Sequence, residues 1–126
     1  MRGMIISGIL FALVVIFCIY SGTRLEKVGG ETSVVIEEIQ NDVENEKWEE
    51  ALLKTQSLQE KWEKDVKWIT VLIDHRETDE INQTLSALCE YVYYRETPEL
   101  MATASSLKQM FEHIPLKERL IIENVF

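Results

Sequence analysis

The chain has 126 residues, a formal net charge of −9 and 46% hydrophobic residues. This length allows one small domain. Residues 31–126 carry 10 Lys and Arg against 21 Asp and Glu, a net charge of −11. Such a domain repels phosphate groups, which argues against nucleic acid and anionic lipid headgroups as ligands. The plainest interpretation of the acidic residues is a solvated surface, and the alternative is a surface that binds cations or a basic partner.

Residues 4–20 form an uncharged apolar run, MIISGILFALVVIFCIY, of 17 residues. With the next three residues, the run reaches the roughly 20 residues that a helix needs to cross a bilayer. A cleaved signal peptide is the alternative, and its apolar core usually has roughly 7–15 residues. Because the run is longer than that, we predict an uncleaved transmembrane anchor over residues 1–22.

Basic residues flank the apolar run on both sides, so their count does not decide its orientation. Arg2 precedes the run, and Arg24 and Lys27 follow it. The short stretch before the run is typical of a signal-anchor, after which the C-terminal part is translocated. We therefore predict a single-pass protein of the cell membrane whose C-terminal domain lies outside the cytoplasm.

Gly29 and Gly30 predict a break after the anchor, with a flexible linker over residues 23–31 and a helical domain over residues 32–126. No glycine follows the break. Four segments of the domain carry apolar residues at helical spacing: Ile36, Ile39 and Val43; Trp48, Leu52, Thr55, Leu58, Trp62, Val66, Ile69 and Ile73; Ile81, Leu85, Leu88 and Val92; and Leu100, Ala104, Leu107, Phe111 and Ile114. Pro115 stops the fourth helix or starts a last short one, with Leu120, Ile121 and Val125 as its contacts. These stripes predict an all-α fold, an antiparallel bundle of about four amphipathic helices preceded by one transmembrane helix.

The segment LIDHRETDEI, residues 72–81, concentrates acids around one of the two histidines. One interpretation is a helix corner, in which Asp74 caps the third helix and Glu77 lies in its first turn. The other is a metal or acid–base site. The Glu-x-x-His pair of di-iron bundles would need an acid at position 72 or 110, where Leu72 and Met110 stand. We therefore favour the corner and predict no metal ligand there.

No motif for catalysis or phosphate binding occurs, so we predict no catalytic, cofactor-binding or metal-ligating residues, no cofactor and no enzymatic activity. Cys18 and Cys89 do not form a disulfide if the first lies in lipid, and Cys89 is interpreted as a buried structural thiol. The tryptophans and the tyrosines at 91, 93 and 94 belong to the core by their spacing. Alternatively, they line a ligand pocket or, if exposed, a partner surface.

Several features together resemble a known family. They are the single N-terminal span, Trp48 followed by Trp62 on one helix, LIDHRE at 72–77 and ENVF at 123–126. The chain resembles, over nearly its whole length, the uncharacterised bacterial single-span family called domain of unknown function 4363, which occurs mainly in spore-forming Gram-positive bacteria. Thr78 departs from the apolar residue usual in the family at that point. The resemblance implies a small, helical, membrane-anchored protein, and it implies no activity or functional residue.

These observations favour a non-catalytic interaction or assembly module at the cell envelope. Its expected partners are the membrane and another protein, and nucleic acid is not expected. A bundle at a fixed place on a membrane can offer a groove to a partner helix. The alternative is an extracytoplasmic sensor or binder of a small ligand or cation through the acidic surface. A pocket with converging polar groups would favour that alternative.

Overall fold

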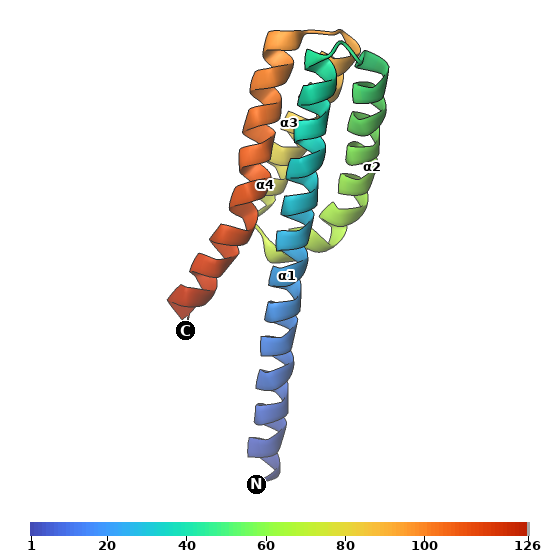
Figure 1. Cartoon of the computed structure of the whole chain (residues 1–126). Coiled ribbons are helices and arrows are strands. Elements are labelled where there is room, and N and C mark those ends of the chain that lie inside the picture. Colours follow the sequence, from blue (N-terminus) through green and yellow to red (C-terminus); the bar gives the residue numbers. More distant parts are fainter. Residues whose placement is uncertain (126) are drawn as a thin grey trace.

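The computed structural model describes the backbone of residues 1–125 and the side chains of residues 1–113. The described residues form four helices and no strand: α1 (Arg2–Glu44), α2 (Trp48–Leu72), α3 (His75–Tyr93) and α4 (Thr97–Val125). Figure 1 shows α1 as the longest element, with its N-terminal half projecting beyond the other helices. The prediction of an all-α fold is confirmed.

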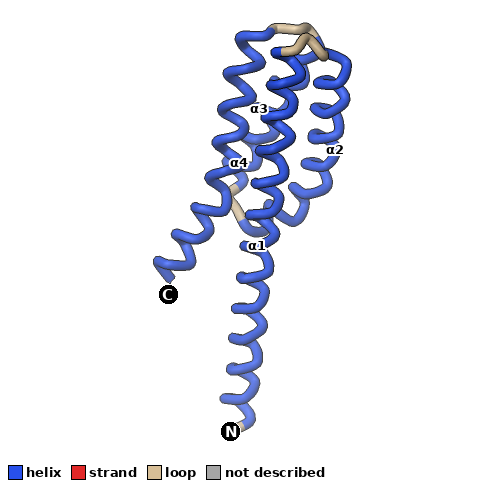
Figure 2. The backbone as a smooth tube through the Cα atoms, in the orientation of Figure 1, coloured by secondary structure: helices blue, strands red, loops and turns tan. Residues whose placement is uncertain are grey.

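The four helices pack in a closed ring, in which each contacts its two neighbours in the order α1, α2, α3, α4. Short turns join them, so successive helices are antiparallel (Figure 2). Among the described side chains, sixteen apolar ones form the core. The predicted stripes of α3 and α4 are buried, from Ile81 to Val92 and from Leu100 to Phe111. The side chains of Ile114, Leu120, Ile121 and Val125, which the sequence also assigned to contacts, lie outside the described ones.

The predicted flexible linker over residues 23–31 is wrong, because α1 passes through Gly29 and Gly30 without interruption. The first bundle helix therefore does not start at residue 32, and the apolar run and the bundle share one helix. Seven of the buried positions on α1 follow a spacing of three and four residues: Ser21, Leu25, Gly29, Thr32, Ile36, Ile39 and Val43. Ser33 and Asp42 are buried beside them. A stripe of this spacing is one face of a helix, and small residues occupy two of its positions. Burial of this face compensates the low helix propensity of the glycines.

The other end of the chain also differs from the alternatives considered. α4 continues through Pro115 to Val125, so Pro115 neither stops the helix nor starts a separate one. A proline inside a helix removes one backbone hydrogen bond and bends the axis. In Figure 1 the last part of α4 diverges from the bundle.

Two turns at the end of the bundle far from the N-terminus share one backbone arrangement. Glu46 and Arg95 have positive φ angles of 59° and 55°. In each turn the next residue donates its N–H five residues back, from Lys47 to Asp42 and from Glu96 to Tyr91. This pattern is the Schellman closure of a helix C-terminus, which usually has glycine at the left-handed position. We call this end, formed by residues 44–50 and 90–99, the distal end.

Helix continuity at the glycine pair is testable by substitution. Gly30 is exposed and helical, and a Cβ added there meets no atom within 4 Å. Gly30→Ala should therefore raise the free energy of unfolding by about 0.5–1 kcal/mol, because alanine loses less backbone freedom on folding. Denaturant unfolding of the full chain in detergent, followed by circular dichroism, measures this difference.

The matched control is Gly3→Ala, since Gly3 lies on the same helix but far outside the bundle and also has open space. It should leave the unfolding transition of the bundle unchanged. A flexible segment at residues 23–31 would predict no gain for Gly30→Ala, and that result would contradict the continuous helix.

Candidate functional site

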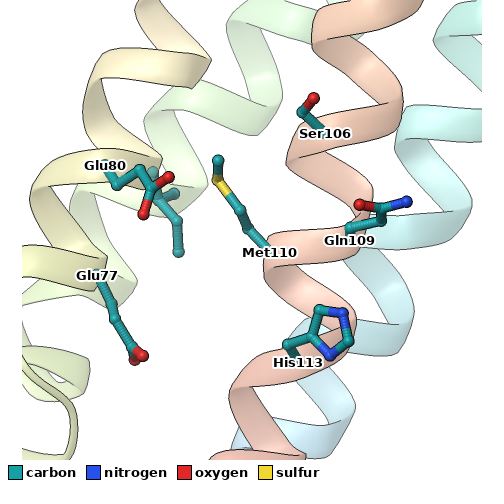
Figure 3. Close-up of a pocket in the computed structure, with 7 residues that line it drawn as sticks. Glu77, Glu80, Ser106, Gln109, Met110 and His113 are labelled. Atoms are coloured by element: carbon teal, nitrogen blue, oxygen red, sulfur yellow. The ribbon is translucent and has the colours of Figure 1, made fainter.

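One depression of the surface lies between α3 and α4, near the end of the bundle from which the apolar half of α1 projects. It is a cavity of about 310 Å³. The lining residues are Glu77, Glu80 and Ile81 on α3 and Ser106, Gln109, Met110 and His113 on α4. In Figure 3 the Met110 side chain projects from α4 towards α3. Acidic, amide, hydroxyl and imidazole side chains thus line the cavity together with the apolar Ile81 and Met110.

A second depression continues the first along the same pair of helices, since both share Ser106 and Met110. Its other lining residues are Gln83, Thr84, Ala87, Tyr91, Ala102 and Thr103. None of these side chains is charged, and several are small. We call the two depressions together the α3–α4 groove. It has an acidic end at Glu77 and Glu80 and an uncharged middle around Ala87 and Thr103.

The segment LIDHRETDEI is the corner between α2 and α3. The Asp74 side chain accepts a hydrogen bond from the backbone N–H of Arg76 at 3.1 Å, which confirms that it caps α3. Glu77 lies in the first turn of α3, also as expected. Asp74 and His75 take no part in the groove lining, whereas Glu77 and Glu80 do. Among the described residues, no group of three His, Cys, Asp or Glu is placed to hold a metal ion.

The sequence did not indicate that Glu80 and His113 share a cavity. On α4, the lining positions 106, 109, 110 and 113 recur at helical spacing beside the buried stripe. On α3, positions 77, 80, 81, 84, 87 and 91 do the same. The sequence therefore did contain a signal for the groove, which is a second stripe of small and polar residues next to each apolar stripe. It becomes a groove only because α3 and α4 are neighbours.

The tryptophans contribute to packing and not to the groove. Trp62 is buried, and its ring meets the Phe111 ring edge-on at 5.2 Å, so the core interpretation is confirmed there. Trp68 is partly buried beneath the Arg24 guanidinium, 4.4 Å from the ring centre. Tyr93 and Tyr94 are 68% exposed and stack edge-on against each other at the distal end. These two tyrosines are therefore surface residues and not core.

Three lysines on α2 and α4 form ion pairs with acidic residues on α1. Lys54 on α2 lies 2.7 Å from an Asp42 carboxylate oxygen, and this hydrogen bond raises the lysine pKa. Lys61 lies 2.8 Å from Glu31 and lowers the pKa of that carboxyl. Lys108 on α4 pairs with Glu37, which raises the pKa of Lys108. The Lys61–Glu31 pair is solvent-exposed, so it adds little to stability, whereas the Asp42 partner of Lys54 is buried.

Cys89 lies beside the buried stripe of α3, and its thiol donates to the Gln59 side chain at 3.4 Å. Burial raises the pKa of the Cys89 thiol, because the thiolate loses hydration there. Cys18 and Cys89 are both free.

The apolar half of α1 is long and apolar enough to cross a membrane by length and composition, and none of it is buried in the bundle. A signal sequence near an N-terminus has the same length and composition. The fold and groove thus define a class: a four-helix bundle whose first helix extends as an exposed apolar rod.

The comparison with known families identifies the group within this class. The family model called "Domain of unknown function (DUF4363)" matches residues 19–125, and the chain belongs to that family. The match begins near the end of the apolar run and covers the bundle, so the resemblance noted in the sequence is confirmed. No curated protein matches the chain. No solved structure matches it either.

The corner interpretation of Asp74 predicts a stability effect. Asp74→Ala should lower the free energy of unfolding by about 1 kcal/mol, because the Arg76 N–H loses its acceptor at the start of α3. Asp74→Asn should retain most of the stability, since asparagine also caps helices. Asp79→Ala, at an exposed position five residues on, serves as the control in denaturant unfolding. Equal losses for Asp74→Ala and Asp79→Ala would refute the capping role.

The raised pKa of Cys89 predicts slow alkylation. In a Cys18→Ser background, iodoacetamide at pH 8 should modify Cys89 several-fold more slowly than an unhindered cysteine, since the thiolate is the nucleophile. Tyr93→Cys, made in a chain that lacks both native cysteines, supplies the exposed reference on the same helix. Mass spectrometry over time gives both rates. A rate at Cys89 that equals the rate at position 93 would contradict the buried thiol.

Proposed function

We propose that the protein is a non-catalytic interaction module, tethered to the cell membrane by the apolar half of α1, that docks a helix of another envelope protein in the α3–α4 groove. The observation that carries this proposal is the continuous α1, which joins an exposed apolar rod to the bundle core. An apolar rod of this length is costly in water and suits a bilayer. The proposal places the bundle outside the cytoplasm.

The chemistry of the groove specifies the kind of partner. The uncharged middle, with Ala87, Ala102 and Thr103, admits a helix with small or apolar side chains at close approach. The acidic end at Glu77 and Glu80 suits a Lys or Arg on that helix. Binding is thus a packing and charge-matching event, with no bond made or broken.

The second candidate function is the binding of a small organic cation in the acidic end of the groove. The specific observation in its favour is the 310 Å³ cavity that two glutamates, a glutamine, a serine and a histidine line. Pockets of this size with a few polar groups are the usual place for small ligands. Substitutions separate the two functions, because Glu77→Gln with Glu80→Gln removes the charge of the cavity, whereas Ala87→Arg fills only the middle of the groove.

Site-specific photocrosslinking tests the docking function in native membranes. A photoreactive amino acid at Thr103, in the middle of the groove, should yield one discrete crosslinked protein. The same group at Leu53, which is exposed on α2, should not yield it. Ala87→Arg should abolish the product from position 103 while the bundle stays folded, because the added side chain occupies the groove. Equal products from positions 53 and 103, or none from either, would contradict docking in the groove.

Protease treatment of intact cells tests the proposed orientation in the same strain. An epitope tag after Phe126 should be removed from outside if the bundle is extracytoplasmic. Protection of the tag in intact cells, with removal after lysis, would place the bundle in the cytoplasm and restrict the partner to that side.

A further inference from the structure

The bundle offers a second surface at the end that faces the apolar half of α1. We call it the proximal end, formed by residues 21–28 of α1 and by residues 64–80, which comprise the last turns of α2, the α2–α3 corner and the start of α3. We propose that the proximal end rests in the headgroup layer of the bilayer that holds the apolar run, so that the bundle stands on the lipid surface and not free above it. This inference rests on the membrane tether of the proposed function.

Along α1, the bundle begins directly after the apolar run ends. Ser21 and Leu25 are already buried against the bundle, directly after the apolar run ends at Tyr20. Arg24 lies four residues beyond Tyr20, or about 6 Å of helix rise. A headgroup layer extends roughly 5–8 Å beyond the hydrocarbon on each side of a bilayer. Because α1 is continuous, no spacer separates the bundle from that layer.

The α2–α3 corner lies at the end of the bundle that is nearest the apolar half of α1. The Arg24 guanidinium lies 4.4 Å from the centre of the Trp68 ring, which fixes the level of Trp68 beside α1. Since α2 runs antiparallel to α1, the residues after Trp68 descend further toward the apolar half. Val71 lies in this last part of α2, and the turn that joins α2 to α3 is the lowest part of that pair of helices in Figure 1.

The side chains of the proximal end include exposed basic residues, a tryptophan and an exposed apolar residue. Val71 is 76% exposed, more than any other large apolar side chain described in the bundle. Tryptophan beside arginine and lysine is typical of membrane interfaces, where the ring lies at headgroup level and long basic side chains reach the phosphates. The exposed basic residues of the proximal end are Arg24, Lys27, Lys64, Lys67 and Arg76. An exposed apolar residue among them suits a lipid surface better than water.

The two ends of the bundle differ in net charge. The distal end carries seven acidic and two basic residues, a net charge of −5. Residues 21–28 and 64–80 carry six acidic and five basic residues, a net charge of −1. The proximal end is therefore nearly neutral in net charge, because its basic residues offset its acids, which include Glu77 and Glu80 of the groove.

Depth measurements on spin-labelled cysteines test the inference. The full chain, with Cys18→Ser and Cys89→Ser, is reconstituted in nanodiscs of phosphatidylcholine and phosphatidylglycerol. Nitroxides are placed by Val71→Cys and by Leu53→Cys, a matched control because Leu53 is a 64% exposed residue of the same helix. Collision with oxygen, which concentrates in lipid, is compared with collision with a water-soluble nickel complex. The oxygen-to-nickel ratio at position 71 should exceed that at position 53 several-fold.

A third label distinguishes the failure of this inference from the failure of the tether. Leu13→Cys lies in the apolar run and should have the highest oxygen-to-nickel ratio. If position 13 reports lipid while positions 71 and 53 give equal ratios, the bundle stands clear of the surface and this inference is overturned. If position 13 also reports water, the run is not in the bilayer, and both the tether and the inference are wrong.

Discussion

The continuity of α1 through Gly29 and Gly30 is the constraint on which the rest of the structure depends. A single helix supplies one wall of the core and then projects as an apolar rod with none of its length buried. A tilt or rotation of the rod therefore moves the bundle with it. A flexible linker would have left the bundle free to rotate, and the faces of the bundle would then have no fixed direction relative to a membrane.

Given that constraint, the bundle divides into regions with different chemistry. The proximal end combines Trp68, Arg24 and Val71 near the end of the apolar run. The distal end is strongly acidic and carries the exposed pair Tyr93 and Tyr94. The α3–α4 groove runs along the side between the two ends and is uncharged in its middle. Under the proposed membrane tether, the rod sets the height and direction at which the groove faces a partner.

The sequence predicted the bundle well where helical spacing was the deciding signal, as in α3 and α4, whose stripes are buried. It failed at the glycine pair, because the local cost of glycine in a helix, about 1 kcal/mol each, is outweighed by packing that only the fold reveals. It also placed Asp74 at the helix corner correctly, since capping is local. The groove was not predictable in this way, because Glu80 and His113 come together only through the pairing of α3 with α4.

The most direct test of the central claim is amide hydrogen exchange over residues 23–31 in the full chain reconstituted in nanodiscs. The account predicts that these amides are protected to the same degree as those of residues 32–44, because one continuous helix holds both segments. Exchange as fast as that of an unfolded peptide at residues 23–31, with protection retained at residues 32–44, would show a linker. The bundle would then be uncoupled from the apolar run, and the account would be wrong.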